Sequence, residues 1–232
     1  MSRRYRDLFF DLDRTLWDFD SNSRLTLEEI YSDFGLARRG IGHCSAFIEV
    51  YQGINEGLWA AYRLGNIHKR ELRSLRFYKT LEHFGCADAL LSERIGNAYV
   101  DISPRKTGIM PYTLEVLEKL APTYRLHIIT NGFEEVQMLK LNNCGLRPFF
   151  TEVVTSEMAA ARKPDPQVFH LAFAKSGAKP AESLMIGDDL RTDIEGARGV
   201  GMDQVYFNPD SKGHEEEITY EIRDLRELLY FL

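Results

Sequence analysis

The sequence predicts an α/β fold, in which a parallel sheet carries helices on both faces and an all-helical unit is inserted after the first strand. The apolar run Leu8–Phe10, which ends in two carboxylates, is typical of a buried strand. From about Ser23 to Ile102 the periodicity is helical throughout. After Pro104 short apolar runs alternate with amphipathic segments, which is the pattern of a parallel sheet with crossover helices.

Length and charge limit the kinds of protein that this chain can be. Its 232 residues, 44% of them hydrophobic, suffice for one good core and a smaller second unit. The net charge of −6 argues against binding a nucleic-acid polymer through a basic face. No apolar run approaches the roughly 20 residues that span a bilayer.

The N-terminus and the cysteines predict a cytoplasmic protein. The basic segment Met1–Tyr5 is followed by a stretch that Asp7 and Asp11 interrupt, which indicates a strand rather than a secretion signal. The three cysteines have the spacing of neither a metal site nor a disulfide framework, so we expect reduced packing residues: Cys44, Cys86 and Cys144.

The inserted unit is predicted to contain four amphipathic helices. Apolar residues recur every three or four positions, and glycine or asparagine follows the first three stripes. The stripes cover Leu25–Phe34, Phe47–Tyr62, Leu72–Phe84 and Leu90–Val100. Four such helices, about 80 residues, can form a small bundle.

The remaining elements alternate between helix and strand. Further strands are predicted at Leu126–Thr130, Glu152–Thr155, Leu184–Ile186 and Gln204–Phe207. Helices are predicted at Thr113–Leu120, Glu134–Asn142, Gln167–Ser176, Asp193–Gly199 and Arg223–Leu229, and a polar surface loop at Asn208–Glu217.

Polar side chains follow several of these strands. The first strand ends in Asp11-Leu12-Asp13-Arg14-Thr15, the second in Thr130-Asn131-Gly132, and another in Gly187-Asp188-Asp189, with Asp193 four residues further on; Lys163-Pro164 precedes a helix. Each motif alone is ordinary turn, cap or surface chemistry. Together, at the ligand-binding edge of a parallel sheet, they offer the nucleophile, acid, cation and donors that a phosphate ester requires.

These four motifs resemble those of the haloacid-dehalogenase superfamily of aspartate-nucleophile phosphohydrolases, over essentially the whole chain. The resemblance implies a Rossmann-like catalytic core at residues 1–18 and 104–232. It also implies a helical C1 cap at residues 19–103.

The resemblance also implies roles for individual residues. Asp11 would attack phosphorus and form an aspartyl phosphate. Asp13 would protonate the leaving oxygen and then deprotonate water. Thr130 and Lys163 would hold the phosphoryl oxygens, and Mg²⁺ would be bound by Asp11, the backbone carbonyl of Asp13, and Asp188.

Three further residues of the motifs are expected to support this site. Asp189 and Asp193 are alternatives for a carboxylate that orients Lys163 or a metal-bound water, and Thr15 is expected beside them. The histidines show no ligand spacing, so none is expected to be catalytic.

Asp13 distinguishes between the reactions of this superfamily. A dehalogenase lacks a carboxylate at this position, so phosphoryl transfer is favoured over dehalogenation. A phosphonate hydrolase would need a cap lysine, but Lys69 and Lys79 lie in polar runs typical of a solvated helix face. A sugar-phosphate phosphatase or a β-phosphoglucomutase-like enzyme stays an alternative, because its motifs are nearly the same. A non-catalytic phosphate sensor is disfavoured because every chemical residue is present.

The cap sequence is most similar to that of the noncanonical pyrimidine 5′-nucleotidases, which have a house-cleaning role. The similar stretches of the cap are Asn55–Trp59 with Tyr62, and Gly65–Ile67. Asp18–Asp20 after the first motif and Thr130–Phe133 of the second add to the likeness. An aromatic platform and an amide could hold a base, and Asn55, Trp59, Tyr62 and Phe133 are side chains of a suitable type. The candidate substrate-binding residues are Asn55, Trp59, Tyr62 and Asn131. Trp59 and Tyr62 also have core spacing, so the sequence leaves both roles open.

Arg14 departs from the superfamily pattern, since many phosphatases carry glycine there. Its cationic side chain is a candidate for binding the substrate's phosphate or sugar. The resulting prediction is a cytoplasmic, Mg²⁺-dependent phosphomonoesterase that acts on a small phosphorylated metabolite, most specifically a pyrimidine nucleoside 5′-monophosphate. We expect a monomer or weak dimer, with neither a nucleic-acid nor a membrane partner.

Overall fold

The computed structural model describes residues 4–232, so the first three residues of the basic N-terminal segment lie outside it. The chain divides into two compact units. One consists of the described part of Met1–Phe19 together with Thr107–Leu232, and the other is the continuous segment Asp20–Lys106. We call them the sheet unit and the helical unit.

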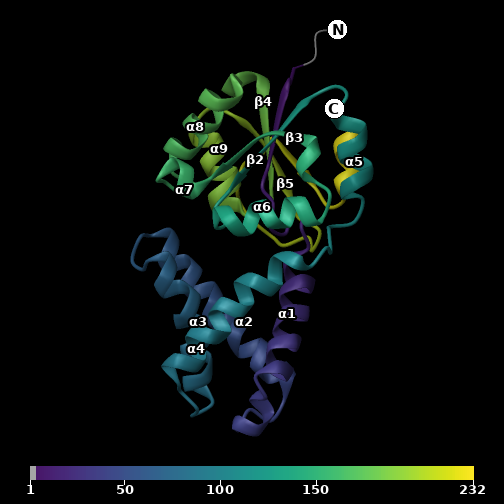
Figure 1. The fold of residues 1–232 in the computed structure, drawn as a ribbon. Coiled ribbons are helices and arrows are strands. Elements are labelled where there is room, and N and C mark those ends of the chain that lie inside the picture. Colours follow the sequence, from purple (N-terminus) through teal and green to yellow (C-terminus); the bar gives the residue numbers. More distant parts are fainter. Residues whose placement is uncertain (1–3) are drawn as a thin grey trace. The chain divides into compact units, whose positions relative to one another are not determined.

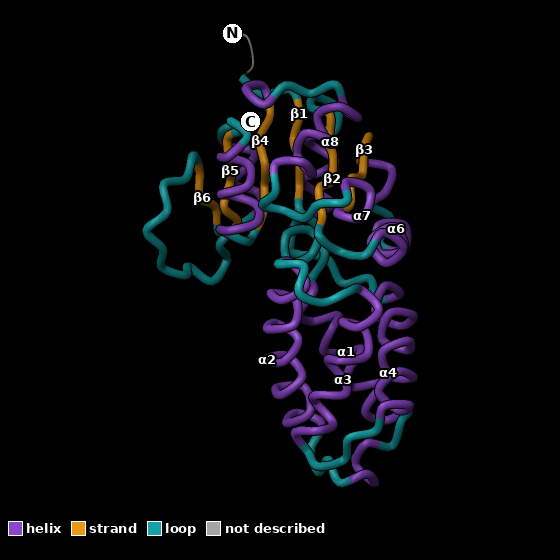
Figure 2. Tube along the Cα trace, turned by 90° about the vertical axis from the view of Figure 1, so that its left-hand side faces the viewer, coloured by secondary structure: helices purple, strands orange, loops and turns teal. Residues whose placement is uncertain are grey.

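The sheet unit contains a six-stranded parallel sheet, as the sequence predicts (Figures 1 and 2). Its strands are β1 (Asp7–Phe10), β2 (Arg125–Thr130), β3 (Phe150–Thr155), β4 (Ser183–Gly187), β5 (Asp203–Phe207) and β6 (Tyr220–Ile222), in the order β3-β2-β1-β4-β5-β6. From β1 the chain builds the sheet first towards β3 and then, from β4, towards β6. The switch point therefore lies between β1 and β4, where such sheets bind ligands at their carboxyl ends.

Helices cover both faces of this sheet. They are α5 (Thr113–Leu120), α6 (Glu134–Asn143), α7 (Ser156–Ala159), α8 (Pro166–Ser176) and α9 (Gly196–Gly199), with a π-helix at Leu190–Glu195 and a terminal 3₁₀-helix at Leu225–Tyr230. Alternate residues of β1 enter different cores, because successive strand side chains point to opposite faces. Leu8 and Phe10 pack in the core that includes α5 and the terminal 3₁₀-helix, whereas Phe9 packs in the core that includes α8.

The helical unit consists largely of α1 (Phe19–Asp33), α2 (Cys44–Arg63), α3 (Lys69–His83) and α4 (Ala89–Ile102). Their apolar stripes form one core, which includes Leu27, Phe47, Phe77 and Ile95. Two residues assigned to those stripes are exceptions, since Leu25 and Leu90 are exposed.

Other details of the sequence prediction also need correction. β6 was not predicted, and the predicted helix at Arg223–Leu229 is a 3₁₀-helix that begins at Leu225. The three cysteines are free and partly buried. Among residues 4–232, none of the helices combines the length and the apolar character that crossing a membrane requires.

Candidate active site

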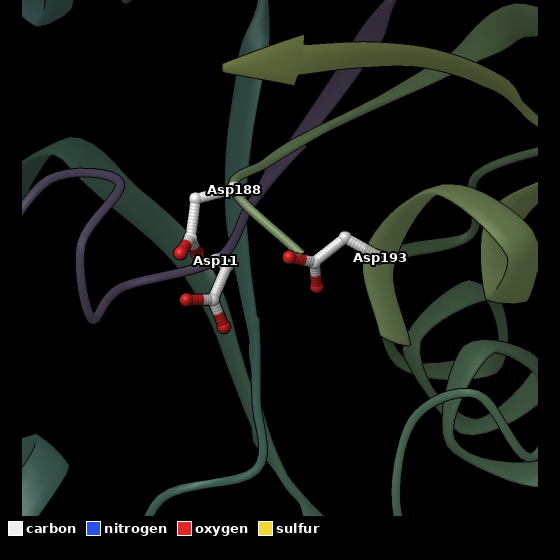
Figure 3. Close-up of side chains that lie close together, drawn as sticks. All are labelled: Asp11, Asp188 and Asp193. Atoms are coloured by element: carbon white, nitrogen blue, oxygen red, sulfur yellow. The ribbon is translucent and has the colours of Figure 1, made fainter. Parts of the chain in front are cut away.

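Two carboxylates lie side by side at the switch point of the sheet. Asp11 follows β1, and its backbone N–H donates to the carbonyl of Ile186 at 2.9 Å, which continues the β1–β4 ladder by one residue. Asp188 follows β4, and Asp193 approaches both from the π-helix (Figure 3). One carboxylate oxygen from each lies within 4.8 Å of the others.

Lys163 links two of these acids. Its Nζ donates to Asp11 Oδ1 at 2.5 Å, to Asp193 Oδ1 at 2.6 Å and to the carbonyl of Ile129 at 2.8 Å. Only 2% of its side chain is exposed. Since an ammonium offers three donors, Lys163 is fully satisfied and holds the acids in one arrangement.

Asp193 can approach this closely because the neighbouring strand ends in glycine. A Cβ on Gly187 would lie 2.3 Å from Asp193 Oδ2, which is far inside van der Waals contact. That same oxygen accepts from the backbone N–H of Asp189 at 3.2 Å. Both oxygens of Asp193 are thus bonded within the protein.

Burial dominates the electrostatics of the acids. It raises the pKa of Asp11 well above its ordinary value, although Lys163 acts in the opposite direction. Burial and the nearby Asp193 carboxylate raise the pKa of Asp188 to about 7. Burial alone would lower the pKa of Lys163, but Asp11 and Asp193 raise it above its ordinary value, so it is a cation.

A divalent metal ion fits this group of residues chemically. Three carboxylates face one ammonium, so their ionised forms leave two negative charges uncompensated among these four side chains. The donors are all oxygens, which hard cations such as Mg²⁺ prefer. Asp11 and Asp188 are better placed to hold the ion than Asp193, whose two oxygens already have partners.

The side chain of Asp13 makes its polar contacts with α6 rather than with this cluster. Gln137 Nε2 donates to Asp13 Oδ2 at 3.0 Å, and the Lys140 ammonium pairs with Oδ1. The Asp13 side chain is 25% exposed. One acid of the motif thus faces Lys163 and the other faces α6.

The residues after β2 organise the loops of the site. The hydroxyl of buried Thr130 accepts from the backbone N–H of Gly132 at 3.1 Å. The Asn131 side chain bonds to the backbone of Lys163 twice, donating to its carbonyl at 3.0 Å and accepting from its N–H at 2.8 Å. The structure therefore engages the Asn131 amide in fixing the Lys163 segment.

Arg14 and Thr15 complete the first motif. Arg14 is exposed, with its guanidinium 4.5 Å from the centre of the Phe19 ring. Its φ of 63° lies in the left-handed region, where glycine is unstrained. Buried Thr15 donates to Asp188 Oδ1 at 3.4 Å.

Asp189 has a local structural contact. Its carboxylate accepts from the backbone N–H groups of Arg191 and Thr192, at 2.9 and 2.8 Å, and so caps the π-helix. Of the two alternatives for orienting Lys163, Asp193 is the one in contact with it.

The three candidates of the helical unit all lie on α2. Asn55 Oδ1 accepts from Arg76 at 3.2 Å and from the Tyr51 hydroxyl at 3.4 Å. Trp59 is partly buried and packs edge-on against buried Tyr62, with ring centres 5.5 Å apart. Their contribution to substrate binding stays a prediction.

Sequence reasoning missed Gln137 and Lys140. Both are buried on α6, although glutamine and lysine side chains are mostly exposed in folded proteins. Their spacing of three residues on one helix face was a signal, but only the tertiary fold brings that face to Asp13.

Comparisons with known proteins identify the family to which the chain belongs. Residues 6–201 match the model of the haloacid dehalogenase-like hydrolases. The chain is 33% identical to the HAD-hydrolase YfnB of Bacillus subtilis, over 99% of this chain and 96% of that protein. The magnesium-bound crystal structure of YfnB has a TM-score of 0.89 and covers 98% of both chains.

Two further relatives carry a more specific description. The pyrimidine 5′-nucleotidases PynA of Streptococcus pneumoniae and YjjG of Escherichia coli are each 30% identical to this chain. The matches cover 97% of this chain and 94% of PynA, and 95% of both this chain and YjjG. The chain belongs to the haloacid dehalogenase-like hydrolases.

Proposed function

We propose that the protein is a Mg²⁺-dependent phosphomonoesterase that acts on pyrimidine nucleoside 5′-monophosphates through a covalent intermediate on Asp11. The observation that carries the proposal is the contact of Asp11 with Lys163, beside Asp188, at the switch point of the sheet. A buried carboxylate must be ionised to act as a nucleophile, and Lys163 favours its anion.

In the first step an Asp11 oxygen forms a bond to phosphorus. The bond between phosphorus and the ester oxygen breaks, and its electron pair stays on the leaving oxygen, which takes a proton from Asp13. In the second step a water molecule transfers a proton to Asp13 while the water oxygen forms a bond to phosphorus. The Asp11–phosphorus bond then breaks, which restores the Asp11 carboxylate and releases inorganic phosphate.

The other residues of the motifs hold and orient. We propose that Asp11, Asp188 and the backbone carbonyl of Asp13 hold Mg²⁺, which when bound would offset the negative charge of phosphate and carboxylates. Lys163 and Thr130 would contact phosphoryl oxygens. Asp193 and Asn131 would keep Lys163 in place through the contacts described above.

Substrate choice is proposed from sequence and relatives together. The two relatives named pyrimidine 5′-nucleotidases support a nucleotide substrate. Within this proposal residues 19–103 are the cap and residues 1–18 and 104–232 the catalytic core. Arg14, Asn55, Trp59 and Tyr62 are the candidates for selecting the substrate.

A phosphate-release assay tests the proposal. The substrates are nucleoside 5′-monophosphates and hexose phosphates, each with Mg²⁺ or with EDTA. We expect uridine and deoxyuridine monophosphates to be preferred, EDTA to abolish turnover, and Asp11→Asn to lower kcat by about 10³-fold or more. The exposed Asp210→Asn serves as the matched control, with unchanged turnover.

Three results would contradict parts of this proposal. A kcat of Asp11→Asn close to that of the wild type, or indifference of turnover to EDTA, would reject the mechanism. Preference for hexose phosphates would reject the nucleotidase assignment and favour a sugar-phosphate enzyme. Binding of phosphate esters without any turnover would identify a sensor.

A further inference from the structure

We propose that Gln137 and Lys140 of α6 are positioning residues for the acid–base group Asp13. This inference rests on the proposed function and deepens it. The two side chains hold both Asp13 oxygens, one through an amide N–H and one through an ammonium. A carboxyl group held at both oxygens keeps one orientation, and each oxygen retains a lone pair that can carry the proton transferred to the leaving oxygen.

The contact with Asp13 requires the ammonium of Lys140 to be buried. Only 4% of its side chain is exposed, and burying an ammonium is unfavourable unless an anion compensates its charge. Its Nζ also lies 3.9 Å from the centre of the Trp17 ring and 5.7 Å from that of Phe19. These rings stabilise the cation, and its ion pair is made with Asp13.

Trp17 belongs to the same turn as Asp13. The two residues form a β-bridge, and the backbone N–H of Arg14 donates to the Trp17 carbonyl at 2.9 Å. Lys140 therefore contacts both the carboxylate and the turn that carries it.

The side chain of Gln137 occupies space that is open only because a residue of the second motif is glycine. A Cβ on Gly132 would lie 2.0 Å from Gln137 Nε2, so any other residue there would displace the amide that donates to Asp13. Gln137 Oε1 is buried without a hydrogen-bond partner among the described residues. Retaining a glutamine whose acceptor is unsatisfied costs stability, which favours a role for its donor.

The test separates proton transfer from folding by the choice of leaving group. The leaving group of uridine 5′-monophosphate is the 5′-alkoxide of uridine, which needs a proton. The leaving group of p-nitrophenyl phosphate is p-nitrophenolate, which is stable without one. Losing the orientation of Asp13 should therefore slow the first step with the nucleotide only. The second step, in which Asp13 activates water, should slow for both substrates.

The variants are Lys140→Met and Gln137→Met, with the exposed Lys119→Met of α5 as the matched control. With uridine 5′-monophosphate we expect kcat to fall about 10²-fold for Lys140→Met and about tenfold for Gln137→Met, with KM nearly unchanged. With p-nitrophenyl phosphate both variants should give a rapid burst of phenolate, stoichiometric with enzyme, followed by slow turnover. Lys119→Met should behave as wild type.

A double-mutant cycle gives a second readout. If Lys140 acts through Asp13, then Asp13→Asn with Lys140→Met should be no slower than Asp13→Asn alone. Multiplicative losses would overturn the proposal, as would equal slowing of the first step for both substrates or wild-type turnover in both variants.

Two other outcomes are distinguishable from these. A wild-type protein that releases no phosphate from any ester rejects the proposed function itself. A Lys140→Met protein that does not fold overturns the role of Lys140, and Gln137→Met then decides the role of Gln137, whose apolar replacement removes an unsatisfied acceptor.

Discussion

The single ammonium of Lys163 compensates charge on two carboxylates of the site. Its ammonium lies between two buried carboxylates, and its backbone is held by Asn131. Removing one partner of such a buried group leaves an uncompensated charge, which typically costs 3–5 kcal/mol. Lys163, to which we assign a role in the proposed reaction, is therefore also a residue on which the stability of the fold depends.

Asp188 makes the metal-free protein sensitive to pH. Burial and Asp193 raise its pKa to about 7, above the unfolded value of about 3.9. Between these values the folded state binds the proton that the unfolded state has lost, so stability falls as pH rises. Without Mg²⁺ we expect Tm to be higher near pH 5 than near pH 8.

Asp188→Asn tests this origin directly. The variant should be more stable than wild type near pH 8 without metal, by several degrees at about 2–4 °C per kcal/mol. It should also lose the stabilisation that Mg²⁺ gives the wild-type protein. Thermal unfolding with and without Mg²⁺ measures both, and equal responses of the two proteins to Mg²⁺ would exclude Asp188 as a ligand.

At the scale of elements, β1 and β2 are joined by a charge cluster at the end of the sheet away from the site. Buried Asp7 accepts from Arg125 at 2.7 Å and pairs with the ring of buried His127 at 3.0 Å. Burial opposes ionisation, but these hydrogen bonds and the Arg125 charge lower the pKa of Asp7 below its ordinary value. The cluster thus stabilises the pairing of these strands.

Asp7→Asn should weaken the sheet without affecting the chemistry. We expect a loss of about 1–3 kcal/mol at neutral pH, with kcat unchanged. Because the folded pKa is lowered, the contribution is complete above about pH 3.9 and disappears as pH falls through the folded value. Urea unfolding of wild type and Asp7→Asn, at neutral pH and at an acid pH well below about 3.9, measures this contribution, and the exposed Asp210→Asn is the control. A difference in stability that persists at acid pH would contradict the ionic origin.

The sequence predicts elements best where burial alone decides them. The centres of β1 and β4 are apolar, and that of β2 is apolar apart from His127, because both faces of the sheet are covered; such runs are recognisable in any short window. β6 has three residues and follows a long polar loop, so its strand state depends on pairing with β5. Leu25 and Leu90 fit a helical stripe but face solvent, since periodicity does not define how wide the buried face is.

The residues of the site likewise divide into those that local sequence predicts and those that depend on tertiary packing. Asp11, Asp188 and Lys163 could be predicted because their motifs lie at strand ends or at a helix start. Lys140 and Gln137 could not, since a lysine on a helix is normally solvated and only the packing of α6 buries these two. The role of Asn131 in substrate binding stays a prediction, and its bonds to Lys163 could not be predicted because they depend on a loop 32 residues away.

For the whole molecule, the candidate metal ligands all belong to the sheet unit. Mg²⁺ should therefore slow hydrogen–deuterium exchange at the ends of β1 and β4 and in the π-helix, with little change in α1–α4. Exchange measured by mass spectrometry with and without Mg²⁺ tests this, and Asp11→Asn should abolish the difference. Protection confined to the helical unit would place the ion elsewhere.

The order of strands also determines when the site can exist during synthesis. β1 is made first, yet its neighbours β2 and β4 begin only at Arg125 and Ser183. The helical unit, which is continuous in the chain, is complete by Lys106. Helices α1–α4 therefore emerge from the ribosome while Leu8–Phe10 has no sheet to join, and Asp11 can meet Lys163 only after 152 further residues have been added.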